Sequence, residues 1–232
     1  MLRLYQLPNI RWGVPNPSPF CMKVETYLRM TGIEYEVVVT VDLTKAPKGK
    51  LPFIEHAEHL IGDSQFILDY LRATFGDALD AGLNPKAKVL GHLVRRTFEE
   101  SLYFPMVYQR WQEDRGWEVT RDLYFRDAPA YAEPARAGML SILRSQGTGR
   151  HSPAEVSALS AADISTLAEI LGQQSFFLGA EPGSIDAGAY GFLANIADVP
   201  VPTAAADQVR SCANLVAFCA RMKERYYPDQ RR

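Results

Sequence analysis

The stretch SPFCMKVE, residues 18–25, decides how the N-terminal part of the chain folds. Ser18 is a favoured helix N-cap residue, and Pro19 suits the first helical position, where its missing N–H leaves nothing unpaired. Apolar side chains then recur at the spacing of one helical face, at Phe20, Val24, Tyr27 and Leu28. The pattern therefore predicts a helix that begins at Ser18. Its unpaired N–H groups and the positive end of its dipole favour an anion there, such as a thiolate or a carboxylate.

Strands flank this helix on both sides. Residues 2–7 predict one strand, and the β-branched residues within 35–42 predict another. Gly32 ends the helix as a left-handed C-cap. The opening is therefore a βαβ unit. The loop at residues 8–17 is long for such a unit, which is typical of a loop that shapes a ligand site or, equally, of a rigid connection.

The next segment completes a thioredoxin-like order of elements. Pro52 stands at the first residue of a third strand, where its missing N–H does least harm. Residues 53–61 predict a hairpin with its turn near residues 56–58, and Gly62, Asp63 and Ser64 begin a helix that ends near Gly76.

The remainder predicts helices only. They are expected at residues 86–114, 130–145, 153–171 after a capping box at Ser152, from the SIDA motif at 184–187 onward, and at 207–226. The fold class is therefore α/β plus all-α. Residues 1–76 form a thioredoxin-like domain, 77–84 a linker with two glycines nearby, and 85–232 an all-helical C-terminal domain.

Composition excludes several classes of function. The net charge of −2 over 232 residues calls for no nucleic acid, and no apolar run approaches the ~18 residues of a membrane span. A strand from residue 2 leaves no room for a signal peptide, so we expect a cytoplasmic protein. The three cysteines suggest no disulfide framework, with Cys212 and Cys219 buried on one helical face. The four histidines lack metal-ligand spacing, so no metal is expected.

Several motifs in order resemble the cytosolic glutathione transferase superfamily. They are SPFCMKVE at 18–25, the Leu51-Pro52 pair, GDSQFILDYL at 62–71 and SIDA at 184–187. More narrowly, they look like the branch of the metaxins and the failed-axon-connections proteins. The resemblance implies the glutathione transferase fold, glutathione as co-substrate, a small electrophilic or peroxide second substrate, and a homodimer.

The resemblance assigns the start of the first helix to thiol chemistry. Ser18 would donate a hydrogen bond to the glutathione sulfur and stabilise its thiolate, a role compatible with a plain N-cap. Cys21 stands at the second-cysteine position of a thioredoxin motif. Burial as a small hydrophobe is one interpretation, and a reactive thiol that would make the protein a glutathione-dependent reductase is the other.

The same resemblance assigns glutathione-binding residues. Pro52 would follow a cis peptide bond that turns the backbone of Leu51 toward the cysteinyl residue of the tripeptide. Ser64 and the helix N-terminus would receive the γ-glutamyl carboxylate, and Asp63 would meet its ammonium. Lys50 would pair with the glycyl carboxylate. The alternatives are a strand-edge proline, an ordinary N-cap pair and a solvated lysine.

Aromatic residues supply the expected pocket for the second substrate, although aromatic side chains at helical spacing equally form core. The candidates are Trp12, Tyr103, Phe104, Tyr108 and Trp111. The leading hypothesis is thus a glutathione transferase that activates the thiol through Ser18. A non-catalytic metaxin-like interaction protein and a thiol reductase acting through Cys21 remain alternatives.

Overall fold

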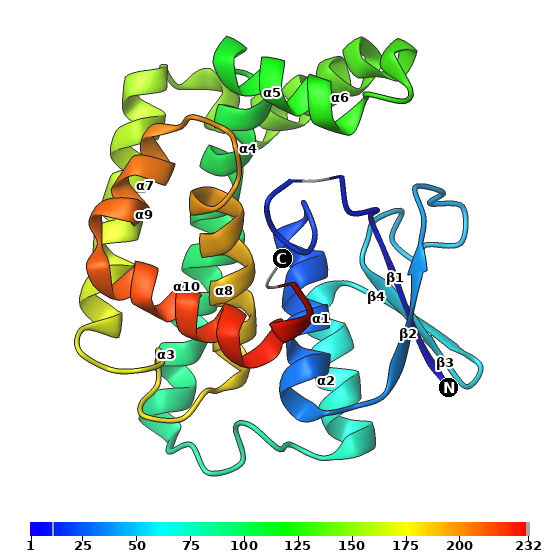
Figure 1. Cartoon of the computed structure of the whole chain (residues 1–232), viewed down its shortest axis with the longest axis vertical. Helices are drawn as coiled ribbons and strands as arrows, with labels where there is room; N and C mark the ends of the chain where they lie inside the picture. The colour runs from blue at the N-terminus through cyan, green and yellow to red at the C-terminus, as the bar shows by residue number, and fades with distance from the viewer. Residues whose placement is uncertain (11, 231–232) are drawn as a thin grey trace.

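The computed structural model describes residues 1–10 and 12–230 of the chain (Figure 1). Its N-terminal part holds a four-stranded sheet in the order β2-β1-β3-β4, with β1 parallel to β2 and the other pairs antiparallel. The strands are β1 (Leu2–Gln6), β2 (Tyr35–Val39), β3 (Phe53–His56) and β4 (His59–Gly62). Helices α1 (Pro19–Thr31) and α2 (Ser64–Phe75) lie between this sheet and the helical part. The predicted thioredoxin-like order is confirmed.

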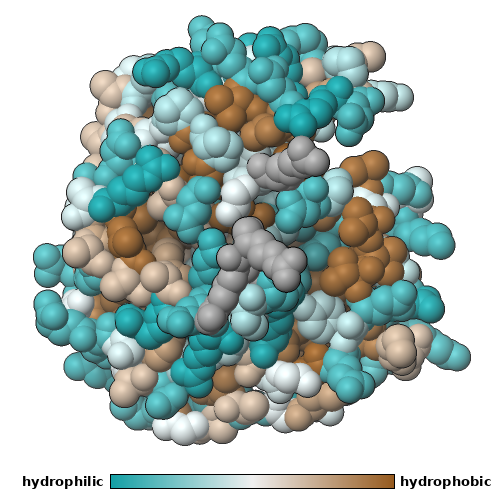
Figure 2. All heavy atoms as spheres, viewed as in Figure 1, coloured by the Kyte–Doolittle hydropathy of each residue, from teal (hydrophilic) through white to brown (hydrophobic). Residues whose placement is uncertain are grey.

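Local sequence explains this arrangement. Leu2 and Leu4 are buried and Arg3 is exposed, as the two-residue period of a strand requires. Gly32 ends α1 with φ +67, the left-handed conformation that glycine adopts without steric cost. Figure 2 shows a patch of hydrophobic side chains over the strands. Val37 and Val39 of the edge strand β2 are exposed.

The remaining elements of the described chain are helical, which confirms the second half of the fold class. They are α3 (Pro85–Arg96), the π-helical turn η1 (Thr97–Leu102), α4 (Tyr103–Trp111), α5 (Asp114–Tyr124), α6 (Ala132–Gln146), α7 (Pro153–Leu171), α8 (Ser184–Ala197), α9 (Ala204–Ser211) and α10 (Ala213–Tyr226), with short 3-10 turns η2 (Pro129–Tyr131), η3 (Thr148–Arg150) and η4 (Pro228–Gln230). The SIDA motif begins α8, and the capping box at Ser152 begins α7, both as predicted.

Two predicted helices were wrong in their continuity. The expected helix at 86–114 widens into η1 and ends at Trp111. Pro105 explains the widening, since its ring has no N–H and would collide with the carbonyl four residues earlier in a regular helix. The expected helix at 207–226 breaks at Cys212, whose backbone is extended. Cys212 is therefore half-buried rather than buried, whereas Cys219 is buried as predicted.

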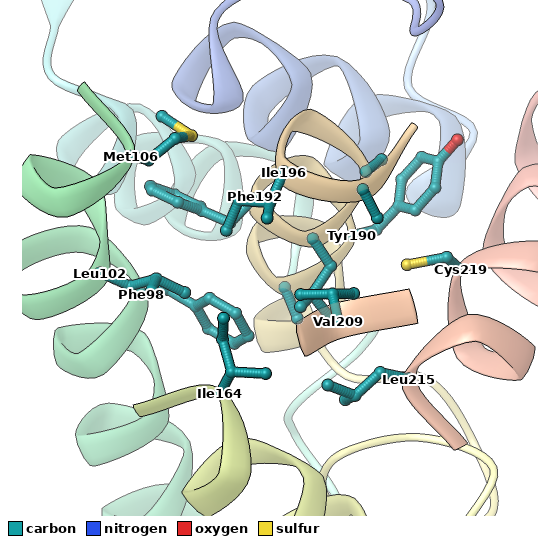
Figure 3. Close-up of a cluster of buried hydrophobic side chains, with 14 of the residues drawn as sticks. Phe98, Leu102, Met106, Ile164, Tyr190, Phe192, Ile196, Val209, Leu215 and Cys219 are labelled. Carbon is teal, nitrogen blue, oxygen red and sulfur yellow. The ribbon is translucent and has the colours of Figure 1, made fainter. Parts of the chain in front are cut away.

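Helix α8 forms the centre of the molecule and packs along α1 (Figure 1). A Cβ atom on Gly191 would lie 2.7 Å from the Pro19 carbonyl oxygen, so only glycine permits this close approach. The other side of α8 packs into the hydrophobic core of the helical part, where Phe98, Phe192 and Ile164 meet (Figure 3). This packing fixes the start of α1 relative to both halves of the chain.

Candidate functional site

Three candidate segments lie at the same end of the sheet, next to the ends of β1, β3 and β4. The register pairs Tyr5, near the end of β1, with Phe53 at the start of β3, and pairs Phe53 with Gly62 at the end of β4. The loop to Ser18 follows β1, the Leu51-Pro52 pair precedes β3, and Asp63-Ser64 follows β4. The topology therefore brings the predicted thiol-binding and tripeptide-binding segments to the same end of the N-terminal domain.

Ser18 is the N-cap of α1, and its side chain is half-buried. Its Oγ accepts a hydrogen bond from the backbone N–H of Cys21 (3.3 Å), and its own N–H donates to Asn16 Oδ1 (3.0 Å). A hydroxyl that accepts in this way keeps one hydrogen to donate. The side chain therefore stands at the positive end of the α1 dipole with a donor available for an anion.

The loop before Ser18 is held by buried polar contacts. Asn16 donates to the Leu7 carbonyl at the end of β1 (2.8 Å). The Pro17 carbonyl accepts from Arg110 (3.2 Å) and from the Tyr124 hydroxyl (3.4 Å). Residues 16 and 17 of the loop are thus held by contacts with Leu7, Arg110 and Tyr124.

Arg110 brings a buried positive charge next to this loop. Its side chain is 4% exposed, lies over the Trp12 ring, and donates to the Asn195 carbonyl as well as to Pro17. Burial lowers its pKa. The Asn195 side-chain oxygen also accepts from Arg110 (3.2 Å), and among the described residues no carboxylate pairs with it, so its positive charge has no counterion there.

Cys21 lies in the interior, one turn into α1. The side chain is fully buried, and burial raises the pKa of its thiol to about 11, although the nearby Ser18 hydroxyl opposes the shift. A thiol with this pKa is almost wholly protonated at neutral pH, and no solvent reaches it. Burial and the raised pKa favour the interpretation of Cys21 as a small buried hydrophobe over that of a reactive thiol.

The Leu51-Pro52 peptide bond is cis, as predicted. Pro52 is buried and Leu51 half-buried, whereas Lys50 is exposed on the preceding turn. A carboxylate-binding role for Lys50 stays a prediction.

Asp63 and Ser64 form the start of α2. Asp63 has φ +81, a region that costs a non-glycine residue on the order of 1–3 kcal/mol, and strain of this kind clusters at ligand-binding positions. One of its oxygens, Oδ1, caps the N–H groups of Gln65 (2.9 Å) and Phe66 (3.4 Å). Ser64 is buried, and its Oγ accepts a hydrogen bond from Lys23 Nζ (3.3 Å). The ordinary N-cap interpretation thus fits Asp63, while Ser64 belongs to a further polar cluster.

That cluster joins α1 to the helical part. Lys23, 2% exposed, donates to Ser64, to Gln65 Oε1 (3.1 Å) and to Glu99 Oε1 (2.5 Å). The other oxygen of Glu99 accepts from Arg95 on α3 (2.9 Å). Burial lowers the pKa of Lys23, and the charge of Glu99 opposes that shift. A lysine and an arginine therefore share one carboxylate, which gives the cluster a net charge of +1.

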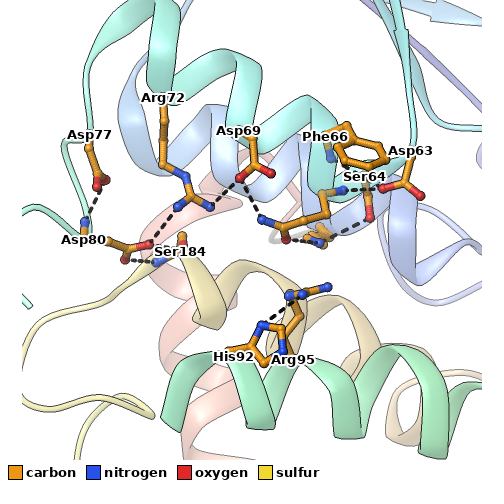
Figure 4. Close-up of polar contacts among 12 residues, drawn as sticks. Asp63, Ser64, Phe66, Asp69, Arg72, Asp77, Asp80, His92, Arg95 and Ser184 are labelled. Atoms are coloured by element: carbon orange, nitrogen blue, oxygen red, sulfur yellow. Dashed lines mark hydrogen bonds and ion pairs between the residues drawn. The ribbon is translucent and has the colours of Figure 1, made fainter. Parts of the chain in front are cut away.

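A cavity of about 240 Å³ opens beside this cluster, between α2, α3 and α8. Lys23 and Gln65 line one end of it. Arg72, Asp80 and Ser184 line the other end, where Ser184 donates to Asp80 (Figure 4). The cavity walls carry both signs of charge, which suits a zwitterionic group better than a simple anion.

The five aromatic residues predicted to line a second-substrate pocket divide into two groups. Trp12 is fully buried and Tyr108 is 2% exposed, so both lie in the core, which favours the alternative interpretation of these aromatic residues. Both belong to the hydrophobic core of the helical part, which Tyr108 joins because α4 packs against α7. Tyr103, Phe104 and Trp111 are half-buried. The centroid of the Tyr103 ring lies 5.0 Å from that of Phe20, in the first turn of α1. These three stay candidates.

Sequence reasoning missed the roles of Lys23, Glu99, Asn16 and Arg110. Each contacts a predicted site residue or its neighbour. The spacing of Arg95 and Glu99, four residues apart, is typical of an ion pair on one helical face. The contact of Asn16 with Ser18 is also local, because the two residues are two positions apart. The contacts of Lys23 with Ser64 and Glu99, and of Arg110 with Pro17, join residues far apart in the chain, which no local pattern reveals.

Residues 1–10 and 12–230 include no helix with both the length and the apolar composition that a membrane span needs. In the same described part of the chain, no three His, Cys, Asp or Glu side chains are grouped so that they could hold a metal ion.

Two family models match parts of the chain. The family described as "Glutathione S-transferase N-terminal domain" matches residues 19–116, and "Glutathione S-transferase, C-terminal domain" matches residues 160–222. The isoprene-epoxide–glutathione S-transferase of Rhodococcus sp. (strain AD45) is 37% identical over 227 residues, which cover 93% of this chain and 95% of that protein.

More distant relatives include proteins not named as transferases. The failed axon connections protein of Drosophila melanogaster is 28% identical over 93% of this chain and 56% of its own length. Human metaxin-1 is 26% identical over 94% of this chain and 49% of its own length. The chain spans about half of each.

Among solved structures, a glutathione S-transferase of Ceriporiopsis subvermispora in complex with glutathione superimposes with a TM-score of 0.68 over 97% of both chains, at 17% identity, which shows a shared fold. With both family descriptions matched and a 37% identical relative covered almost end to end, the chain belongs to the glutathione S-transferase superfamily, in the branch that includes the failed axon connections protein and the metaxins.

Proposed function

We propose that this protein binds glutathione at the end of the sheet where Ser18, Leu51-Pro52 and Asp63-Ser64 lie, and transfers it to a small epoxide or a related electrophile. The observation that carries the proposal is the position of Ser18, whose Oγ is held at the N-terminus of α1 by the Cys21 N–H. The 37% identical relative is named for the conjugation of isoprene epoxide, which supports an epoxide as the substrate class.

In the proposed reaction the Ser18 hydroxyl donates to the glutathione sulfur and favours its thiolate. An ordinary thiol has a pKa of about 8.5, so a drop of about two units would make the thiolate the main form at pH 7. The sulfur then attacks one ring carbon of the epoxide. A C–S bond forms, the C–O bond breaks, and the alkoxide takes a proton from water. Because Ser18 forms no covalent bond, its contribution is to the thiolate population.

Turnover of glutathione with a short-chain 1,2-epoxide tests this proposal. We expect wild-type protein to form the thioether, and Ser18→Ala to lower kcat/KM by about 10²-fold, since one charge-assisted hydrogen bond at a reacting atom has that order of effect. Ser18→Thr keeps the hydroxyl and is the matched control. Glutathione binding without turnover of epoxides or other electrophiles would favour the metaxin-like alternative, a non-catalytic interaction protein.

We also propose that the protein forms a homodimer. Exposed apolar side chains on α2 and α3 support this, namely Phe66, Val89 and Leu93. Light scattering of the purified protein measures the mass directly. A mass near twice the 25.9 kDa of the chain is expected, and a monomer at micromolar concentration contradicts it.

A further inference from the structure

Buried lysines need a reason, because an ammonium group loses its hydration on burial. Lys23 of α1 is only 2% exposed, so its ammonium group does not reach solvent. Its stem lies against Gly188 of α8, where a Cβ atom would make an ordinary van der Waals contact with Lys23 Cδ at 3.6 Å. Lys23 is therefore a buried charged residue packed between α1 and α8.

The direction of the hydrogen bond between Lys23 and Ser64 is fixed by chemistry. An ammonium group can only donate, so Ser64 Oγ must be the acceptor. The hydroxyl hydrogen of Ser64 is then left to donate elsewhere. Within the part of the chain that the structure describes, no acceptor for that hydrogen is found. A buried hydroxyl with an unused hydrogen at a helix N-terminus is suited to a carboxylate.

Charge around Ser64 is arranged with opposite signs on two sides. Lys23, Arg95 and Glu99 together carry +1. Asp63, directly before Ser64, carries −1 and is exposed. An α-amino acid group has its carboxylate and ammonium on one carbon, so it can meet both sides at once.

We propose that Lys23 is a positioning residue for the α-carboxylate of the γ-glutamyl group. It holds the Ser64 oxygen so that the hydroxyl hydrogen faces that carboxylate, and it supplies the net positive charge behind it. This rests on the proposed function and names the residue, outside α2, that makes the γ-glutamyl end of the site selective. Glu99 keeps Lys23 in place from the helical half, so both halves of one chain build the recess.

The test compares two ligands by calorimetry. One is glutathione, and the other is 4-aminobutanoyl-cysteinyl-glycine, which is glutathione without the α-carboxylate. We expect Lys23→Met to weaken glutathione binding about tenfold or more, the order of a hydrogen bond to a charged group, and to change binding of the analogue less than about twofold. The control, Lys86→Met, removes an exposed lysine of α3 that does not line the cavity and should leave both affinities unchanged.

A second variant guards against misfolding. Lys23→Met leaves Glu99 with one cation, so Lys23→Met/Glu99→Gln, which also removes the carboxylate charge, is measured beside it, and thermal melting checks that each variant folds. The same ligand-selective loss is expected in both. An equal loss for the two ligands, or no loss for either, overturns the role of Lys23 while the proposed function stands. A wild-type protein that binds neither ligand at millimolar concentration overturns the proposed function itself.

Discussion

Lys23 Nζ lies 2.5 Å from Glu99 Oε1, although the two residues are 76 positions apart, and this buried ion pair joins α1 to the helical half. Removing one partner would leave the other charge buried without its counterion. We therefore expect Glu99→Leu to lower the free energy of unfolding by about 3–5 kcal/mol, and Lys23→Met/Glu99→Leu to recover most of that loss.

Urea unfolding followed by circular dichroism measures these differences. The matched control is the ion pair of Arg96 with Glu100, one residue further along the chain than Arg95 and Glu99. Its charged atoms lie 2.9 Å apart, and both side chains are about half-exposed. Glu100→Leu should cost less than about 1 kcal/mol, because solvent screens the pair. A double variant that is no more stable than Glu99→Leu alone would show that the ion pair is not the stabilising contact.

Arg110 should act on the thiolate through its charge. It is buried beside the Pro17 carbonyl, directly before Ser18, and no carboxylate of the described residues neutralises it. We expect Arg110→Met to raise the pKa of the bound glutathione thiol by about one unit, because a buried cation next to the residue before Ser18 favours the thiolate. The pH dependence of thiolate absorbance measures this shift. Arg121→Met, an exposed control on α5, should leave it unchanged.

The three cysteines should differ sharply in reactivity. Burial raises the pKa of Cys21 to about 11 and raises that of Cys219 still further, whereas Cys212 is half-buried between two helices. Iodoacetamide at pH 7.5 should therefore modify Cys212 first, as read by mass spectrometry of the peptides. Cys21→Ala should keep glutathione conjugation at the wild-type level. Rapid alkylation of Cys21 in the folded protein would restore the reductase hypothesis.

Asp186 should make stability depend on pH. It is fully buried at the start of α8, accepts the N–H groups of Phe177 (2.9 Å) and Gly183 (2.8 Å), and burial raises its pKa to about 7. The unfolded carboxyl ionises near its ordinary pKa of about 3.9, so the folded state holds the proton more tightly. This contribution to stability is fully present below about pH 4 and is lost as the pH rises to about 7.

The comparison with Asp186→Asn isolates this contribution, because the amide does not titrate. The free energy of unfolding of wild type minus that of the variant should fall by on the order of 1 kcal/mol per pH unit between pH 4 and 7. A difference that stays constant or rises over this range would mean that the carboxylate is charged in the folded protein.

The sequence predicted the site through features that act locally. Ser18 and Pro19 mark one helix start and Asp63 precedes another, so local residue preferences are enough to identify the two helix ends that favour an anion. The resemblance to glutathione transferases added the cis bond before Pro52. The roles of Lys23 and Arg110 were not predictable, because each depends on a partner brought near by the tertiary fold.

The break between α9 and α10 was not predictable from the sequence, because it also depends on tertiary packing. Cys212 lies within a continuous apolar period, yet the chain turns there so that α9 and α10 can both pack against the core. Burial of Trp12 was similarly decided by the contacts of Arg110 and Tyr124 with its ring, which join residues about a hundred positions apart. Such packing overrides periodicity.

The ionisation of bound glutathione tests the central claim most directly. Titration of thiolate absorbance near 240 nm, with saturating glutathione, gives the pKa of the bound thiol. The account predicts a value about two units below the ordinary thiol value of about 8.5 in wild type, and a return toward that value in Ser18→Ala with binding retained. A bound thiol with an unshifted pKa in wild type, or the same lowered pKa in Ser18→Ala, would contradict the role assigned to Ser18.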